Sequence, residues 1–206
     1  MALTQKQVSE LYVAIFNRAS EGAGNKFWQT SQNGAAAANA MLATPDAKTY
    51  FGTSLDSNKA FIEHIYSNTL NKTDDADGIK FWVDALDSGM SRGEIVASFV
   101  ASVAKYADST NAKDKAAYDQ FNNRVEVSNY MANTVEKAPA DYKTSTAFAT
   151  SGTTGLVVTN SASTVTTAKT SVDTMKPVPG QTFTLTTGVD NILGTAGKDT
   201  VTGTLG

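Results

Sequence analysis

Apolar side chains near the N-terminus recur with the spacing of an amphipathic helix. Val8, Leu11, Tyr12, Ile15 and Phe16 occupy positions i, i+3, i+4, i+7 and i+8 of one stripe, the pattern of a helix that packs one face against a core. The stripe recurs 54 residues later, with one polar exception, at Ile62, Ile65, Tyr66, Thr69 and Leu70. The chain therefore predicts two related helices, each opening one copy of a repeat.

The two copies align without a gap from Tyr12 to Trp28 and from Tyr66 to Trp82. The identical pairs are Tyr12/Tyr66, Asn17/Asn71, Gly24/Gly78, Lys26/Lys80, Phe27/Phe81 and Trp28/Trp82, and Arg18 and Lys72 share their charge. An acidic or glycine-containing turn follows the first helix of each copy, and a second helix begins near the shared glycine. We expect the repeats at about residues 8–52 and 62–107.

Other sequence signals mark where helices begin and predict two more helices after the repeat. The Ser/Thr-x-x-Glu/Gln signature of a helix start occurs at Thr4/Gln7 and Ser91/Glu94. Apolar residues spaced along polar segments predict a long helix over 111–137 and another helix over 161–175.

The composition changes toward the C-terminus, where threonine is abundant and charge is sparse. After Pro177 and Pro179, apolar residues alternate with threonine and glycine, which predicts short strands. We expect a helical domain over 1–176, then a linker and the start of a β-repeat region over 177–206. The fold class is therefore mainly α: a tandem helical repeat bundle followed by the first strands of a β-rich array. Because the pattern stops without a closing element, we expect the chain to be an N-terminal piece of a longer protein.

Composition excludes several classes of site. The 206 residues carry 17 Lys and Arg against 20 Asp and Glu, so no basic field favours nucleic acid. The absence of cysteine excludes thiol catalysis, zinc–thiolate sites and disulfides. The single histidine, His64, leaves no His–His metal site and has no nucleophile motif, so we expect a partly exposed surface residue. No signal-peptide pattern and no membrane-spanning apolar run is present.

The repeat resembles a short helical domain of undefined function that occurs in bacterial exported proteins, often in pairs at the N-terminus of surface-layer (S-layer) proteins. The segment from Leu185 to Thr204 looks like the entry into the Gly/Asp-rich parallel β repeats of the same proteins. The resemblance covers about residues 1–107 and 182–206. It implies a secreted, extracellular structural protein of the cell surface, exported without an N-terminal signal peptide by type I secretion. In Gram-negative members, it implies that this region anchors the surface array to lipopolysaccharide.

The expected function is accordingly non-enzymatic anchoring of an S-layer protein through the lipopolysaccharide O-chain (O-antigen). Its partners would be the O-chain and other surface-layer subunits, with no nucleic acid and no transmembrane segment. The alternative is a structural module for subunit–subunit contacts that binds no glycan. A glycan-processing enzyme ranks last, because it needs two converging carboxylates and the only dense acidic cluster lies on one turn.

Six residues around the two equivalent turns are candidate lipopolysaccharide ligands: Arg18, Lys26, Lys72, Lys80, Asn17 and Asn71. Lys and Arg suit phosphates and acidic sugars, and we expect the four cations to face one region. Solvated helix ends are an equal alternative, because cations stabilise helix C-termini.

No cofactor is required, but four aspartates are weak calcium candidates. Asp75 and Asp77 precede Gly78 as in part of an EF-hand loop, although the first position lacks a carboxylate and the last lacks the bidentate Glu. Asp190 and Asp199 resemble acidic positions of calcium-binding β repeats, without the paired glycines. Structural turns are the favoured interpretation for all four.

The repeated aromatic residues are expected to be structural. Trp28 and Trp82 could stack on sugars, but duplication favours packing of each helix against the preceding one. The same expectation of core packing applies to Tyr12, Tyr66, Phe27 and Phe81.

Overall fold

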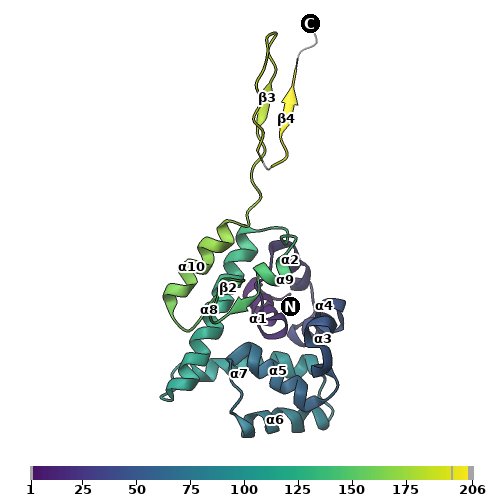
Figure 1. Ribbon diagram of the computed structural model, residues 1–206. Coiled ribbons are helices and arrows are strands. Elements are labelled where there is room, and N and C mark those ends of the chain that lie inside the picture. Colours follow the sequence, from purple (N-terminus) through teal and green to yellow (C-terminus); the bar gives the residue numbers. More distant parts are fainter. Residues whose placement is uncertain (1, 196, 204–206) are drawn as a thin grey trace.

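The computed structural model describes residues 2–195 and 197–203 and confirms a mainly α fold (Figure 1). The first repeat spans α1 (Gln5–Phe16), α2 (Gly22–Gln29), α3 (Gly34–Ala43) and α4 (Pro45–Phe51), and the second spans α5 (Asn58–Leu70), α6 (Ala76–Asp87) and α7 (Arg92–Val103). Two short 3₁₀ segments, Gly52–Leu55 and Ala104–Tyr106, follow α4 and α7. The remaining helices are α8 (Ala112–Thr134), α9 (Tyr142–Ser145) and α10 (Ala162–Asp173).

The helices begin and end where local chemistry satisfies their free backbone groups. Both predicted capping boxes are present, at Thr4/Gln7 before α1 and at Ser91/Glu94 before α7. The first helix of each repeat ends at an asparagine in the left-handed conformation, with φ of 47° at Asn17 and 51° at Asn71. Asparagine tolerates this conformation better than most residues. The conformation explains why both copies carry asparagine there.

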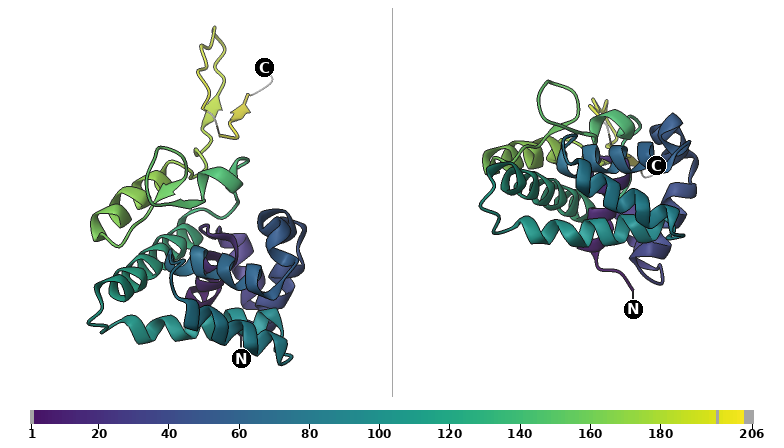
Figure 2. Two further views of the ribbon diagram at one scale, coloured as in Figure 1. Left: turned by 60° about the horizontal axis from the view of Figure 1, so that its bottom comes forward. Right: turned by 90° about the horizontal axis from the view of Figure 1, so that it is seen from below.

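The two copies pack into one body. Helix α3 lies against α7, and α1 lies against both α5 and α8, so the first repeat packs against both the second repeat and α8. Helix α10 covers α8, as Figure 2 also shows. The shared core includes the apolar stripe residues of both first helices, and the polar exception, Thr69, is buried beside them. None of the described helices is long and apolar enough to cross a membrane.

A buried tyrosine holds the second helix of each repeat. Tyr12 and Tyr66 are 3% and 2% exposed. A Cβ atom added at Gly24 would clash with the Tyr12 hydroxyl, and one at Gly78 would clash with the Tyr66 hydroxyl. The shared glycine is therefore required by the close approach of the tyrosine to the helix backbone.

The expectation that Phe27 and Phe81 belong to the core is wrong. Each phenylalanine is 64% exposed, whereas the neighbouring Trp28 and Trp82 are partly buried against the core. Adjacent residues on a helix point about 100° apart, and α2 and α6 present only one side to the body. The tryptophan takes the inward side, and the phenylalanine packs edge-on against it, with ring centroids 4.9 Å and 5.0 Å apart in the two copies.

Arg124 on α8 joins the C-terminal ends of the first helices of both repeats. It is 3% exposed, and its Nη1 donates to the Asn17 side-chain oxygen and to the backbone oxygen of Asn68, each at 3.0 Å. Its Nε donates to the Val158 carbonyl at 3.4 Å. Helix C-termini carry partial negative charge, so α1 and α5 together stabilise the buried cation. Burial lowers the pKa of Arg124 to about 10, which leaves it charged at neutral pH.

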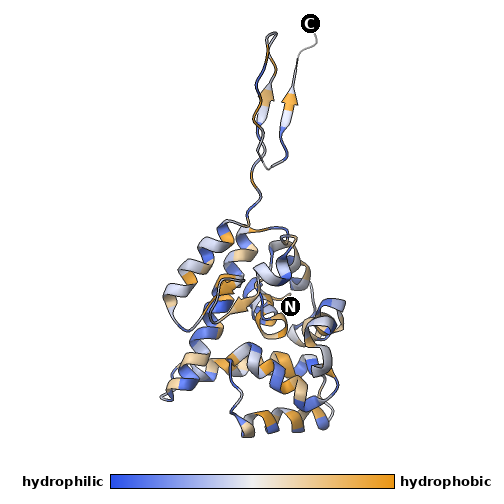
Figure 3. Cartoon of the chain, viewed as in Figure 1, coloured by the Kyte–Doolittle hydropathy of each residue, from blue (hydrophilic) through white to orange (hydrophobic). Residues whose placement is uncertain are grey.

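The strands are short and form two parallel pairs. Strand β1 (Phe148–Ala149) pairs with β2 (Leu156–Val157) beside α8 and α10, and β3 (Thr182–Thr184) pairs with β4 (Thr200–Thr202). After α10 the chain leaves the helices and forms the β3–β4 segment, which extends away from them in Figure 1. Several apolar side chains of this segment lie open to solvent, among them Val189 and Leu193. Figure 3 colours the apolar stretches of the segment orange.

We expect Arg124→Met to destabilise the protein by about 3 kcal/mol. The substitution removes three hydrogen bonds from a charged donor, worth about 1.5–3 kcal/mol each, but it also removes the desolvation cost of the buried cation, which offsets part of that loss. Urea unfolding followed by circular dichroism measures the change. Lys169→Met is the matched control. Lys169 on α10 forms a partly exposed ion pair with Glu126, which lies on α8 as Arg124 does, and such pairs contribute at most about 1 kcal/mol. Equal effects of the two substitutions would contradict the role assigned to Arg124.

Candidate functional site

The turn after α1 lines an open cavity of about 350 Å³, here called the Arg18 pocket. Its walls come from the end of α1, from α4 and from α9, which are far apart in the sequence. Three aromatic side chains and three charged ones line it: Phe16, Tyr50, Tyr142, Arg18, Asp46 and Lys143. Aromatic walls with a few placed polar groups are typical of small-molecule sites.

The charged groups of the Arg18 pocket are held by the aromatic ones. The Arg18 guanidinium carbon lies 4.5 Å from the centre of the Tyr142 ring and 5.0 Å from that of Phe16, as cation–π pairs do. The Tyr142 hydroxyl donates to Asp46, and Lys143 pairs with the same carboxylate at 3.0 Å. Among the described residues, no carboxylate oxygen lies within 4.0 Å of the Arg18 guanidinium nitrogens. Its donors are therefore available to a ligand.

Hydrogen bonding within the Arg18 pocket shifts two pKa values in opposite directions. The bond from Tyr142, with the ion pair to Lys143, lowers the pKa of Asp46. The same bond raises the pKa of the Tyr142 hydroxyl. At neutral pH Asp46 is a carboxylate and Tyr142 keeps its proton. Asp46 is the single carboxylate among the described residues that line the pocket, so the pair of carboxylates used in glycoside hydrolysis does not form there.

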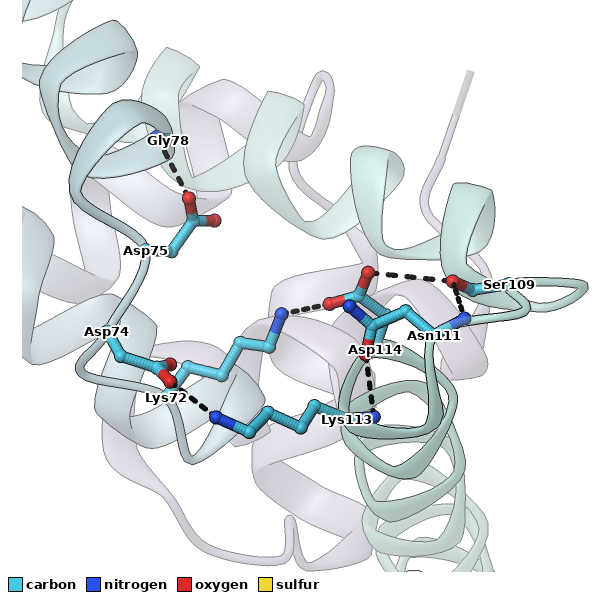
Figure 4. A network of polar contacts seen from close by, with 8 residues as sticks. All are labelled: Lys72, Asp74, Asp75, Gly78, Ser109, Asn111, Lys113 and Asp114. Carbon is cyan, nitrogen blue, oxygen red and sulfur yellow. Dashed lines mark hydrogen bonds and ion pairs between the residues drawn. The ribbon is translucent and has the colours of Figure 1, made fainter.

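The equivalent turn of the second repeat lines another cavity, of about 420 Å³, here called the Asn71 pocket. It lies between this turn and α8, and Asn71, Lys72, Lys113, Gln120 and Asn160 are among its lining residues. The Lys72 ammonium pairs with Asp114, and Lys113 pairs with Asp74 at 2.8 Å, as drawn in Figure 4. The turn after the first helix of each repeat, Asn17-Arg18 or Asn71-Lys72, thus lines a pocket of its own.

The six candidate ligand residues are not gathered into one site. Asn17 and Arg18 line the first pocket, and Asn71 and Lys72 line the second. Lys26 on α2 pairs with Glu136 at 2.7 Å, and Lys80 on α6 pairs with Asp84 at 2.8 Å.

The expectation that the four cations face one region is wrong, because α2 and α6 lie at opposite ends of the helical body (Figure 1). The repeat places α2 beside α1 and α8, but α6 beside α5 and α7. Sequence reasoning also missed Asp46, Tyr50 and Tyr142, which no motif connects to the repeat.

The calcium candidates take separate structural roles. Asp75 caps α6 by accepting from the Gly78 amide, and Asp77 is exposed in the first turn of that helix. Within residues 2–195 and 197–203, no three His, Cys, Asp or Glu side chains come together as a metal site. The caps and turns in which these aspartates lie agree with the favoured interpretation.

Asp190 and Asp199 organise two equivalent turns nine residues apart. Asp190 accepts hydrogen bonds from the backbone and hydroxyl of Thr186, and Asp199 accepts the same pair from Thr195. Asp199 also accepts from the Gln181 amide at 2.7 Å, which ties β3 to β4. These bonds lower the pKa of Asp199.

His64 belongs to the packing around α4 and α5. Its ring stacks on Phe51 with centroids 4.3 Å apart, and its Nδ1 lies 3.2 Å from the Ser54 hydroxyl. Burial lowers the pKa of His64, so the ring is neutral at pH 7. The ring is half-buried and lines neither pocket.

Comparison with known proteins gives one family match. Residues 38–106 match the model of a family described as a domain of unknown function (DUF4214). The match includes the second copy of the Phe-Trp repeat and covers about a third of the chain. No curated protein and no solved structure matches the chain.

We expect Asp199→Ala to loosen the β3–β4 pairing and leave the helices intact, because it removes the acceptor that joins Gln181 to Thr195. The backbone NMR shifts of Thr182–Thr184 and of α8 measure this, with Lys198→Ala as the exposed control. Because hydrogen bonds hold the Asp199 pKa below its unfolded value of about 3.9, its contribution is present at neutral pH and is lost as pH falls through the folded pKa. If a calcium chelator added at pH 7 abolishes the β3–β4 pairing, bound calcium holds these turns, and the hydrogen bonds from threonine to aspartate are not sufficient to hold them.

Proposed function

We propose that the chain is a non-enzymatic anchoring module that binds the lipopolysaccharide O-chain and holds a surface-layer protein on the cell. The Arg18 pocket is the proposed binding site. The resemblance of the repeat and of the C-terminal segment to surface-layer proteins supports the choice of ligand. The proposal implies an extracellular location at the cell surface and export without an N-terminal signal peptide.

The observation that carries the proposal is the composition of the Arg18 pocket. A sugar presents an apolar face of C–H groups and a rim of hydroxyls. The rings of Tyr50 and Tyr142 suit the apolar face, and the Arg18 guanidinium and the Asp46 carboxylate supply a donor and an acceptor for hydroxyls.

The Arg18 pocket carries one net positive charge, from Arg18, which fits a neutral or weakly acidic sugar. Lys143 and Asp46 neutralise each other, and the whole chain has a net charge of −3. Long-range attraction of an anionic polymer is therefore weak. Affinity would come from short-range contacts and from many subunits that bind one cell surface together, because avidity multiplies modest affinities.

We expect the chain to bind smooth lipopolysaccharide and not rough lipopolysaccharide, which lacks the O-chain. Arg18→Gln and Tyr142→Ala should each weaken binding to the smooth form roughly tenfold, since each removes one or two contacts worth about 1 kcal/mol. Sedimentation with lipopolysaccharide micelles measures binding, and circular dichroism checks the fold. The control is Lys26→Ala with Lys80→Ala, whose cations lie outside both pockets. Equal binding to smooth and rough forms would refute the proposal.

The exposed phenylalanines favour a second function, contact between subunits. Phe27 and Phe81 present similar edge-on Phe-Trp pairs at equivalent positions of the two repeats, each with 64% of its surface open. Exposed aromatic side chains are common centres of protein interfaces. A lattice subunit would use such duplicated contacts to bind neighbours on two sides.

If subunit contact is the function, Phe27→Ser with Phe81→Ser should abolish self-association and leave lipopolysaccharide binding unchanged. Analytical ultracentrifugation over a concentration series measures self-association. Tyr50→Ser is the control, because Tyr50 is also exposed but lies in the Arg18 pocket. A wild-type chain that stays monomeric at millimolar concentration would count against this second function.

A further inference from the structure

Gln120 is a buried amide whose nitrogen has no hydrogen-bond partner among the described residues. Its side chain reaches the Asn71 pocket from α8, and the residue is 6% exposed. The Nε2 atom has no hydrogen-bond partner and almost no exposed surface. Such a group costs free energy in the folded protein and calls for an explanation. A hydrophobic residue at this position would avoid the cost.

The charges around Gln120 are already neutralised. Lys72 pairs with Asp114, and its side chain is only 13% exposed, while Lys113 pairs with Asp74. Besides these ion pairs, the polar groups that line the pocket are uncharged: the amides of Asn71, Gln120 and Asn160 and the hydroxyl of Thr73. A ligand of this pocket therefore gains from hydrogen bonding and not from net charge.

We propose that the Asn71 pocket is a second sugar subsite, which takes an uncharged sugar residue through an acceptor oxygen, either a hydroxyl or an acetamido carbonyl. The orphan group of Gln120 is a donor, so it needs an acceptor from the ligand. The nitrogen has almost no exposed surface, so a ligand would contact it only after rotation about the soft terminal torsion of the glutamine, which exchanges the amide oxygen and nitrogen and turns the nitrogen toward the pocket. This inference rests on the proposed binding of the O-chain.

The repeat gives the two pockets a common origin. Asn17-Arg18 and Asn71-Lys72 are the same turn in the two copies, and each lines one pocket. The O-chain is itself a repeating polymer. A module with two subsites would hold two sugar residues of one chain, and the second contact would form at high effective concentration.

The test compares Gln120→Leu with the wild-type chain. Its probe is O-polysaccharide freed of lipid by mild acid from smooth lipopolysaccharide, with binding measured by calorimetry. We expect the dissociation constant to rise about 3- to 10-fold, the equivalent of one lost hydrogen bond. The melting temperature should stay the same or rise, by up to about 2–4 °C, because the variant removes an unsatisfied donor.

Asn122→Leu is the matched control, since Asn122 is an amide on α8 that donates within its own helix. Ala116→Phe, which fills the pocket from its partly exposed edge, is the second variant and should also weaken binding. Wild-type affinity in both Gln120→Leu and Ala116→Phe overturns the subsite, as does a lower melting temperature in Gln120→Leu. If Arg18→Gln weakens binding and these variants do not, the subsite fails and the proposed function stands. If the wild-type chain does not bind the polysaccharide, both fail.

Discussion

The arrangement of the helical body depends on one buried charge that has no ion-pair partner among the residues that the structure describes. Arg124 is surrounded by neutral acceptors: an asparagine side chain and two backbone carbonyls. A buried cation is tolerated only where such groups are fixed in place. Both repeats must therefore present the C-terminal ends of their first helices to the same point on α8. The left-handed turn at Asn17 turns its side-chain oxygen toward that point, so the helix cap and the charge site are one structure.

The duplicated repeat is a scaffold whose copies have acquired different neighbours. The tyrosine, glycine and tryptophan keep the second helix against the first in both copies. The position of Asn25 in α2 corresponds to Ile79 in α6, and both side chains are buried. Asn25 enters a polar cluster with Ser9 and Ser20 beside α8, whereas Ile79 joins the apolar core. The internal frame is thus repeated, and the faces that meet other elements are not.

Local chemistry was readable from the sequence, and the meeting of distant segments was not. The stripe from Val8 to Phe16 and the capping boxes depend on neighbours within one or two turns, so their patterns predicted helices that the structure contains. The exposure of Phe27 depends on which side of α2 the rest of the chain covers, which no local pattern encodes. Arg18 was identified as a candidate because it flanks a repeated turn. Its pocket partner Tyr142 arrives from a short helix with no counterpart in the repeat, and Gln120 had no sequence signal at all.

The register of the C-terminal strands has a mechanical consequence. Thr182 pairs with Thr200 in parallel, so one circuit of the chain returns to its starting direction after 18 residues and advances by one strand spacing, about 4.8 Å. An extended strand of the same number of residues would reach roughly 60 Å. The paired arrangement therefore makes the segment shorter than an extended strand and two strands wide. Force applied along β4 would therefore load the backbone hydrogen bonds that join it to β3, such as those from Thr200 to Gln181 and from Leu185 to Thr202, before it reached the helices.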